Sequence, residues 1–215
     1  MTWWQRSRGQ DRQPADPDRA TRGHDAVAAA FVAVPRDGFL PEAQRWRSAV
    51  DGPLEIGHGQ TNSQPRTVAD MLRLLDVQPR QRVLDVGAGS GWTTALLATL
   101  VGPGGFVLGL ERVPGLARWG GEKLRRHAVG RTDLGQATLE LADPGELGRA
   151  SGAPWDRILV SAMARALPSA LVDQLADGGR MVCPVAGRMV LVERRGDEVA
   201  VSSHGAYRFV PLIEP

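Results

Sequence analysis

A glycine-rich loop lies in the middle of the chain, between a short apolar run and a helix-like segment. The run 83–86 contains Asp85 and leads directly into Gly87, Gly89 and Gly91. Glycines at such a place let a ligand approach the backbone, and the first turn of the following helix presents unpaired N–H groups. The sequence therefore predicts a nucleotide-binding loop.

Acidic residues near this loop distinguish it from a loop that binds a pyrophosphate. A pyrophosphate is an anion, so a neighbouring carboxylate would not favour its binding. Asp85 precedes the first glycine by two residues, and Glu111 follows Gly91 by 20 residues, at the end of the next expected strand. There a carboxylate can accept hydrogen bonds from both hydroxyls of a ribose. Asp143 follows the third expected strand, where an acceptor can meet the amine of adenine.

These three acids favour a cationic adenosine cofactor, and S-adenosylmethionine fits that description. The spacing D-x-G-x-G-x-G also differs from the G-x-G-x-x-G of nicotinamide cofactor sites. The competing interpretation is that Asp85 and Asp143 only cap helices, as aspartate often does.

Strands and helices must alternate to place these acids at one edge of a sheet. Apolar runs predict strands at residues 82–86, 105–110, 138–141, 157–160 and 181–185. Amphipathic or apolar segments predict helices at 67–75, 92–101, 113–127 and 167–175. This order predicts an α/β fold with a doubly wound, mostly parallel sheet. After residue 186 the pattern predicts an antiparallel hairpin that turns at Gly196 and Asp197, then one more strand that Pro211 stops.

The chain divides by composition into a polar start and one domain. Residues 1–22 are rich in arginine, aspartate and proline, which predicts a flexible leader. Residues 23–215 then form a single domain. Its parts are an N-terminal helix with a covering loop (23–80), a cofactor-binding core (81–185) and C-terminal strands (186–215).

Composition excludes several other functions. The chain has 215 residues and a formal net charge of +2, too small for a protein that relies on phosphate contacts, so we expect no nucleic-acid partner. The single cysteine, Cys183, excludes an internal disulfide and a cysteine-clustered metal site. No apolar run reaches the roughly 20 residues of a membrane span, and no secretory signal is present. We therefore expect a cytoplasmic protein, a monomer, without a metal or a membrane partner.

Two segments before the sheet carry a family resemblance. Residues 54–65 read LEIGHGQTNSQP and residues 34–42 read VPRDGFLPE. Together with LDVGAGSGWTTALLA, PWDRILVSAM, LPSALVDQLADGGRMVCPV and the terminal RFVPLI, they resemble the protein-L-isoaspartate O-methyltransferase family. The likeness covers most of residues 25–213, in matching order and spacing.

The resemblance implies a Rossmann-like class I methyltransferase that uses S-adenosylmethionine. Its acceptor would be the free α-carboxylate of an L-isoaspartyl residue in a peptide or protein. The ester would then collapse to a succinimide, which hydrolyses partly to normal aspartyl. A carboxylate with a pKa near 4 is ionised at pH 7, so this reaction needs alignment and desolvation and no general base.

The resemblance also implies site residues. It assigns Ser63 to positioning the acceptor carboxylate, although a serine before Gln64 and Pro65 is also a plain helix N-cap. The cofactor contacts it implies are His58, Asp85, Gly87, Gly89, Ser90, Glu111, Arg112, Ala142 and Asp143. The substrate contacts are Thr61, Ser63, Arg165 and Val210, with the last strand pairing along a peptide backbone.

Some of these residues have a plainer alternative. His58 is as well explained by a structural or surface position as by a cofactor contact. Trp92 can wall the cofactor pocket or belong to the core, and we favour the core. Cys183, in an apolar strand, suits inert packing.

Departures from the family pattern leave the substrate open. The usual Gly-Asp-Gly is here Ala142, Asp143 and Pro144, and the alanine run after the fourth strand is interrupted by Met163 and Arg165. Arg165 can hold a second carboxylate or be a solvated arginine at a helix start. Three functions follow: general repair of isoaspartyl sites, a dedicated methyltransferase for one modified peptide, or a silent cofactor-binding partner subunit. A nucleic-acid methyltransferase is disfavoured because neither a basic stripe nor an aromatic platform is evident.

Overall fold

The computed structural model describes residues 26–215, so the expected leader at 1–22 lies outside the described residues. Residues 26–33 are helical, and the helix ends before Pro35. Two 3₁₀ helices follow, η2 (Arg36–Phe39) and η3 (Glu42–Arg47). A small hairpin of β1 (Leu54–Gly57) and β2 (Gln60–Asn62) then leads to helix α2 (Pro65–Leu75).

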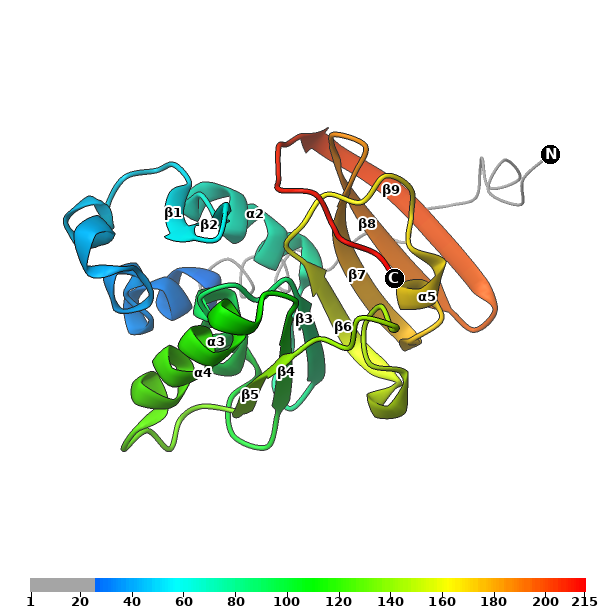
Figure 1. The fold of residues 1–215 in the computed structure, drawn as a ribbon. Helices are drawn as coiled ribbons and strands as arrows, with labels where there is room; N and C mark the ends of the chain where they lie inside the picture. The colour runs from blue at the N-terminus through cyan, green and yellow to red at the C-terminus, as the bar shows by residue number, and fades with distance from the viewer. Residues whose placement is uncertain (1–25) are drawn as a thin grey trace.

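A seven-stranded sheet forms the centre of the molecule (Figure 1). Its strands are β3 (Arg82–Val86), β4 (Phe106–Glu111), β5 (Gln136–Leu141), β6 (Trp155–Val160), β7 (Leu175–Val185), β8 (Arg188–Arg195) and β9 (Glu198–Ala206). They lie in the order β5-β4-β3-β6-β7-β8-β9, with the first five parallel and the last two antiparallel. The predicted α/β class, mostly parallel sheet and C-terminal hairpin are confirmed.

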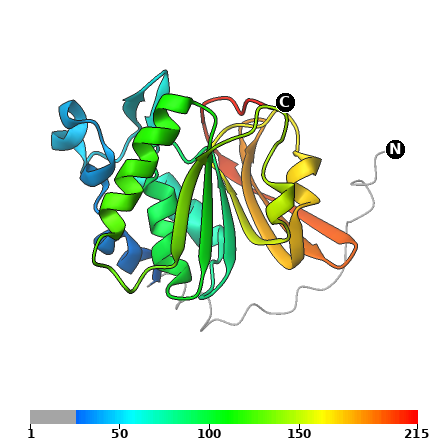
Figure 2. The same cartoon turned by 60° about the horizontal axis from the view of Figure 1, so that its bottom comes forward.

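Helices cover the two faces of the sheet unequally, as Figure 2 shows. Helices α2, α3 (Trp92–Val101) and α4 (Pro114–Ala128) lie on one face, and the short α5 (Ser169–Val172) lies on the other. Each face has its own buried cluster: Val83 packs in the first and its neighbour Leu84 in the second, both fully buried. Strands buried on both faces read as continuous apolar runs, which is why the sequence located them well.

The chain order of the strands creates a crevice at one edge of the sheet. From the central β3 the chain goes first to β4 on one side and later to β6 on the other. The connections after β3 and β6 therefore diverge at the carboxyl ends of these strands, which is where ligands bind in open α/β sheets. No helix within residues 26–215 is long and apolar enough to cross a membrane.

The helix expected at 167–175 is shorter than predicted. Helix α5 ends at Val172, and Leu175 already belongs to the eleven-residue β7. The carbonyl of Gln174 accepts the N–H of Trp155, so the backbone is paired with β6 directly after the helix. The pairing of β7 with β6 therefore overrides the helical pattern that the sequence shows up to residue 175.

The strand expected in residues 207–215 is also wrong. This segment makes one isolated bridge, between Met163 and Pro211. The N–H of Met163 donates to the carbonyl of Val210 and the N–H of Leu212 donates to Met163. Pro211 has no N–H with which to extend a ladder, so the segment crosses the carboxyl edge of the sheet as an irregular tail.

Candidate active site

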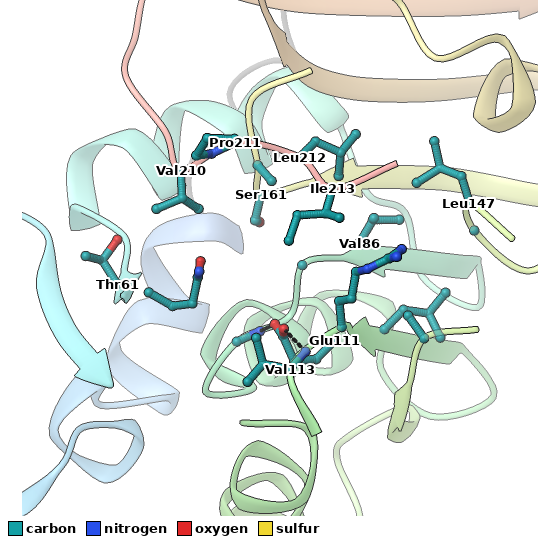
Figure 3. A pocket seen from close by; sticks show the side chains of 18 of the residues that line it. Thr61, Val86, Glu111, Val113, Leu147, Ser161, Val210, Pro211, Leu212 and Ile213 are labelled. Carbon is teal, nitrogen blue, oxygen red and sulfur yellow. Dashed lines mark hydrogen bonds between the residues drawn. The ribbon is translucent and has the colours of Figure 1, made fainter. Parts of the chain in front are cut away.

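A cleft of about 770 Å³, its open mouth included, lies at the carboxyl ends of β3 and β4 (Figure 3). Among the predicted site residues it brings together Thr61, Gly87, Gly89, Glu111, Arg112, Ala142 and Val210. Pro211 also lines it, within the last segment that the resemblance places along a substrate peptide. The sequence did not single out the other lining residues, which are Gln60, Val86, Leu110, Val113, Glu146, Leu147, Gly148, Ser161, Ala162, Leu212 and Ile213.

A second cleft of about 300 Å³ adjoins the first. It is lined by Asn62, Ser63, Ala88, Ser90, Trp92 and Thr93, and it shares with the first cleft Thr61, Gly87, Gly89 and Ser161. We call the two the cofactor cleft and the serine cleft. The first turn of α3 lies at the serine cleft, so unpaired N–H groups of that turn border the same volume as the Ser63 side chain.

The glycine loop takes conformations that need glycine. Gly87, Gly89 and Gly91 have φ values of +81°, +53° and +82°. A Cβ on Gly89 would lie 3.3 Å from Cδ1 of Ile56, and one on Gly91 would lie 2.9 Å from a backbone oxygen of α4. The loop is therefore packed between the β1–β2 hairpin and α4, and it can approach a ligand through its backbone.

Glu111, the last residue of β4, lines the cofactor cleft and binds backbone N–H groups at the edge of the cleft. The side chain is 7% exposed. Its Oε2 accepts the N–H of Gly89 and its Oε1 accepts the N–H of Val113, each at 2.8 Å. A carboxylate has about four acceptor positions, so two remain for hydroxyl groups of a ligand.

Asp85 lies on the face of the sheet that α3 covers and lines neither cleft. It is fully buried, and its Oδ2 accepts the hydroxyls of Thr93 and Thr94 at 2.7 Å each. Its other oxygen has no hydrogen-bond partner among the described residues. Burial raises the pKa of this carboxyl to about 6. In this structure Asp85 fixes the start of α3 to β3.

Arg36 organises the segment that precedes the sheet. Its side chain is buried, and it donates to the side chain of Asn62 at 2.6 Å and to the carbonyl of Ser63 at 2.8 Å. Three more bonds go to the carbonyls of Val50, Gly52 and Asn62. Burial lowers the pKa of Arg36 to about 10, so the guanidinium stays charged at neutral pH. One cation thus pairs four carbonyls from two separate stretches of the chain, residues 50–52 and 62–63.

Asn62 connects this segment to the glycine loop. Its amide oxygen accepts from Arg36, and its amide nitrogen donates to the hydroxyl of Ser90 at 3.0 Å. Ser63, the next residue, does not cap α2: the N-cap is Gln64, without a side-chain cap bond. The Ser63 hydroxyl makes no hydrogen bond to the described residues, so it is free to donate into the serine cleft.

Three other predicted contacts lie away from both clefts. His58, at the hairpin tip with φ +55°, packs against Gly115, where a Cβ would lie 2.9 Å from its Nε2. Asp143 is exposed and accepts the N–H of Gly145 at 2.8 Å. Arg165 is exposed and lines neither cleft.

Two residues with open interpretations are largely buried. Trp92 is 2% exposed and donates from Nε1 to the carbonyl of Val34 at 3.1 Å, so it belongs to the core while its edge reaches the serine cleft. Cys183 is fully buried, and burial raises the pKa of its thiol to about 12. Such a thiol is a poor nucleophile.

The cofactor cleft fits an adenosine cofactor. Glu111 offers two acceptor positions for ribose hydroxyls, and the apolar Val86, Leu110 and Leu147 suit a flat base. The glycine backbone suits a close approach by the rest of the ligand. Within residues 26–215 no group of three or more His, Cys, Asp or Glu side chains could hold a metal ion.

Comparisons with known proteins agree with this geometry. The sequence model of the family described as Protein-L-isoaspartate(D-aspartate) O-methyltransferase (PCMT) matches residues 17–215. The chain is 45% identical over 192 residues to a protein-L-isoaspartate O-methyltransferase of Methanopyrus kandleri, covering 87% of this chain and 83% of the relative. A relative of the same name in Aeropyrum pernix is 44% identical over 192 residues, with 87% and 72% covered.

A solved structure is similar in fold as well. It is a candidate protein-L-isoaspartate O-methyltransferase of Plasmodium falciparum in complex with S-adenosyl-L-homocysteine. It superposes with a TM-score of 0.73 at 29% identity, covering 91% of this chain and 94% of that one.

The sheet is mostly parallel, with a glycine loop after its central strand, an acid at the end of the next strand and two antiparallel strands at its C-terminal end. Together with the family match and the likeness to a structure solved with S-adenosyl-L-homocysteine, this architecture identifies a class I methyltransferase that uses S-adenosylmethionine. Within that class, the family model and the identity to curated relatives are decisive. The chain belongs to the protein-L-isoaspartate O-methyltransferase family.

Proposed function

We propose that this protein methylates the free α-carboxylate of L-isoaspartyl residues in peptides and damaged proteins, which starts their repair through a succinimide. One observation carries the proposal: the cofactor cleft and the serine cleft adjoin and share four lining residues. A methyl donor in the first and an acceptor carboxylate beside Ser63 in the second would meet at this junction.

S-adenosylmethionine supplies an electrophilic methyl group when it is bound. The protein's own residues then bind and align. Glu111 accepts the ribose hydroxyls while it keeps its bonds to the backbone of Gly89 and Val113. The Ser63 hydroxyl donates to the acceptor carboxylate and fixes its orientation. The carboxylate is already the nucleophile at neutral pH, so no residue has to remove a proton.

The tail and the β1–β2 hairpin border the cofactor cleft and limit the access of water to the point of transfer. Residues 210–213 of the tail form one wall of the cofactor cleft, and Thr61 of β2 lies across from them (Figure 3). The tail is held by the backbone bonds of Met163 to Val210 and Leu212. Removing water from a carboxylate makes it a stronger nucleophile toward a cationic methyl donor.

The decisive experiment compares two peptides that differ only at one linkage. Enzyme and methyl-labelled cofactor are incubated with an isoaspartyl peptide and with its aspartyl twin, in several unrelated sequences. We expect labelling of the isoaspartyl member of each pair. Labelling of neither member would overturn the proposal, and labelling confined to one sequence would support a dedicated peptide methyltransferase instead.

Ser63→Ala tests the acceptor side of the site. We expect turnover of the isoaspartyl peptide to fall about tenfold or more, because a hydrogen bond to a charged group is lost, while cofactor affinity stays within about twofold. Ser169→Ala, at the exposed start of α5, is the matched control and retains full activity. Full activity of Ser63→Ala would remove this residue from its role.

We also propose that the protein works as a monomer in the cytoplasm, without nucleic acid. The small net charge supports the last point. Light scattering of the purified protein tests the monomeric state, and fractionation of cells tests the cytoplasmic location. A stable dimer, or a protein found outside the cytoplasm, would contradict them.

A further inference from the structure

We propose that Ser161 is a second hydroxyl that binds the acceptor carboxylate, opposite Thr61 and together with Ser63. The proposal rests on the proposed function and adds a substrate-binding residue from the central sheet. Ser161 directly follows the last residue of β6. It is one of four residues that line both clefts, and apart from Thr61 it is the only one of them with a side chain.

The position of Ser161 follows from the role of each cleft. Glu111 and the apolar residues place the nucleoside in the cofactor cleft, and Ser63 places the acceptor in the serine cleft. The methyl group must cross where the two clefts meet. Residues that line both clefts therefore surround the point of transfer.

The backbone holds Ser161 rigidly at this point. Its N–H donates to the carbonyl of Val86 at 2.8 Å. Its Cβ lies 3.9 Å from the place where a Cβ on Gly87 would be, so the glycine loop packs directly against it. Because the backbone is already held here, only the rotational freedom of the side chain is lost when its hydroxyl binds a ligand.

The hydroxyl of Ser161 is available to a ligand. It makes no hydrogen bond to any described residue, and the same holds for the hydroxyls of Thr61 and Ser63. Figure 3 shows the Ser161 side chain directed into the cavity, between the tail and the glycine loop. Three free hydroxyl donors around one junction, without a cation that lines the serine cleft, suit a small anion such as a carboxylate.

The two oxygens of the acceptor have different needs. The oxygen that takes the methyl group must keep its electron density, so a hydrogen bond to it would slow the reaction. The other oxygen can accept hydrogen bonds without that penalty, and donors on it orient the group. Ser63 from the covering loop and Ser161 from the sheet approach the junction from different elements, which fixes the carboxylate plane better than one donor does.

The experiment measures steady-state kinetics with an isoaspartyl peptide and cofactor affinity by calorimetry. The variants are Ser161→Ala, Ser161→Thr, Ser63→Ala and the control Ser169→Ala. We expect Ser161→Ala to lower kcat/KM for the peptide about tenfold, mainly through KM, with cofactor Kd changed less than about twofold. Ser161→Thr retains the hydroxyl and restores most of the loss.

A double variant sharpens the assignment. If Ser63 and Ser161 bind one carboxylate, the combined loss in kcat/KM differs from the product of the single losses. Unchanged kcat/KM in Ser161→Ala, or a loss that Ser161→Thr does not restore, overturns the proposal. Equal weakening of cofactor binding would assign Ser161 to the cofactor and also overturn it. Failure of the wild-type enzyme on the isoaspartyl peptide would instead contradict the proposed function.

Discussion

Two irregular walls of the active site are held by buried charges of opposite sign. On the glycine-loop side, the carboxylate of Glu111 accepts the N–H of Gly89, and the carboxylate of Asp85 accepts the hydroxyls of Thr93 and Thr94 at the start of α3. The loop before α2 presents carbonyls inward, and the guanidinium of Arg36 donates to them. Buried backbone N–H and C=O groups that lie outside helices and strands still need hydrogen-bond partners.

The comparison explains how a rigid site is built from loops. A single charged side chain reaches several backbone groups that are far apart in the sequence, which no local turn can do. Arg36 contacts residues 14 to 27 positions away. Such bonds are stronger than neutral ones, and removing the charge leaves several polar groups unpaired at once.

The loop before α2 is therefore the more fragile wall, and Arg36→Met should have the largest effect. We expect the free energy of unfolding to fall by about 3 kcal/mol or more, because buried carbonyls lose their donor. Urea unfolding measures this loss. Arg195→Met, at an exposed position at the end of β8, changes stability by less than about 0.5 kcal/mol. A small loss in Arg36→Met would show that water replaces the guanidinium.

On the glycine-loop wall, Glu111 should govern cofactor affinity. Glu111→Ala removes the acceptor for the ribose and the bond to Gly89, so we expect the Kd for S-adenosylmethionine to rise by about 30-fold, or about 2 kcal/mol. Calorimetry at pH 7.5 measures it. Asp85→Asn is the matched control, because Asp85 is a buried acid that lines neither cleft, and its Kd should change only a few-fold. Equal losses in the two variants would contradict the division of roles between these acids.

Asp85 should instead appear in the pH dependence of stability. Its pKa is about 6 when folded and near 3.8 ordinarily, so between these values the folded protein keeps a proton that the unfolded chain has lost. Asp85 therefore contributes a fall in unfolding free energy of about 2 kcal/mol as pH rises from about 4 to 7, and this contribution levels off above about pH 7. The difference in unfolding free energy between Asp85→Asn and wild type isolates this contribution. A difference that stays constant from pH 4 to 7 would refute it.

Prediction from sequence worked best where the signal is local. β3 and α3 were located to the residue, and the acid at the end of β4 was placed at the cofactor cleft, because apolar runs and glycines fix these features within a few positions. Asp85 was predicted to contact the cofactor, yet it lines neither cleft. Because β3 is buried on both sides, its sequence shows no alternation from which the face of Asp85 could be assigned. Arg36 reads as a charged residue after a proline, and only the fold brings its five acceptors together. Ser161 carries no local signal either, because its importance comes from two clefts that meet beside it.

The bond between Asn62 and Ser90 joins the two walls, and it should give the smallest and most selective effect. The Asn62 amide accepts from Arg36 on one side and donates to Ser90 on the other. Ser90→Ala, Asn62→Ala and the double variant form a cycle whose coupling energy in cofactor binding we expect to be about 1 kcal/mol. A coupling energy near zero would mean that the glycine loop and the loop before α2 contribute to cofactor binding independently. A measurable coupling would mean that cofactor binding helps to set Ser63, the next residue, for the acceptor.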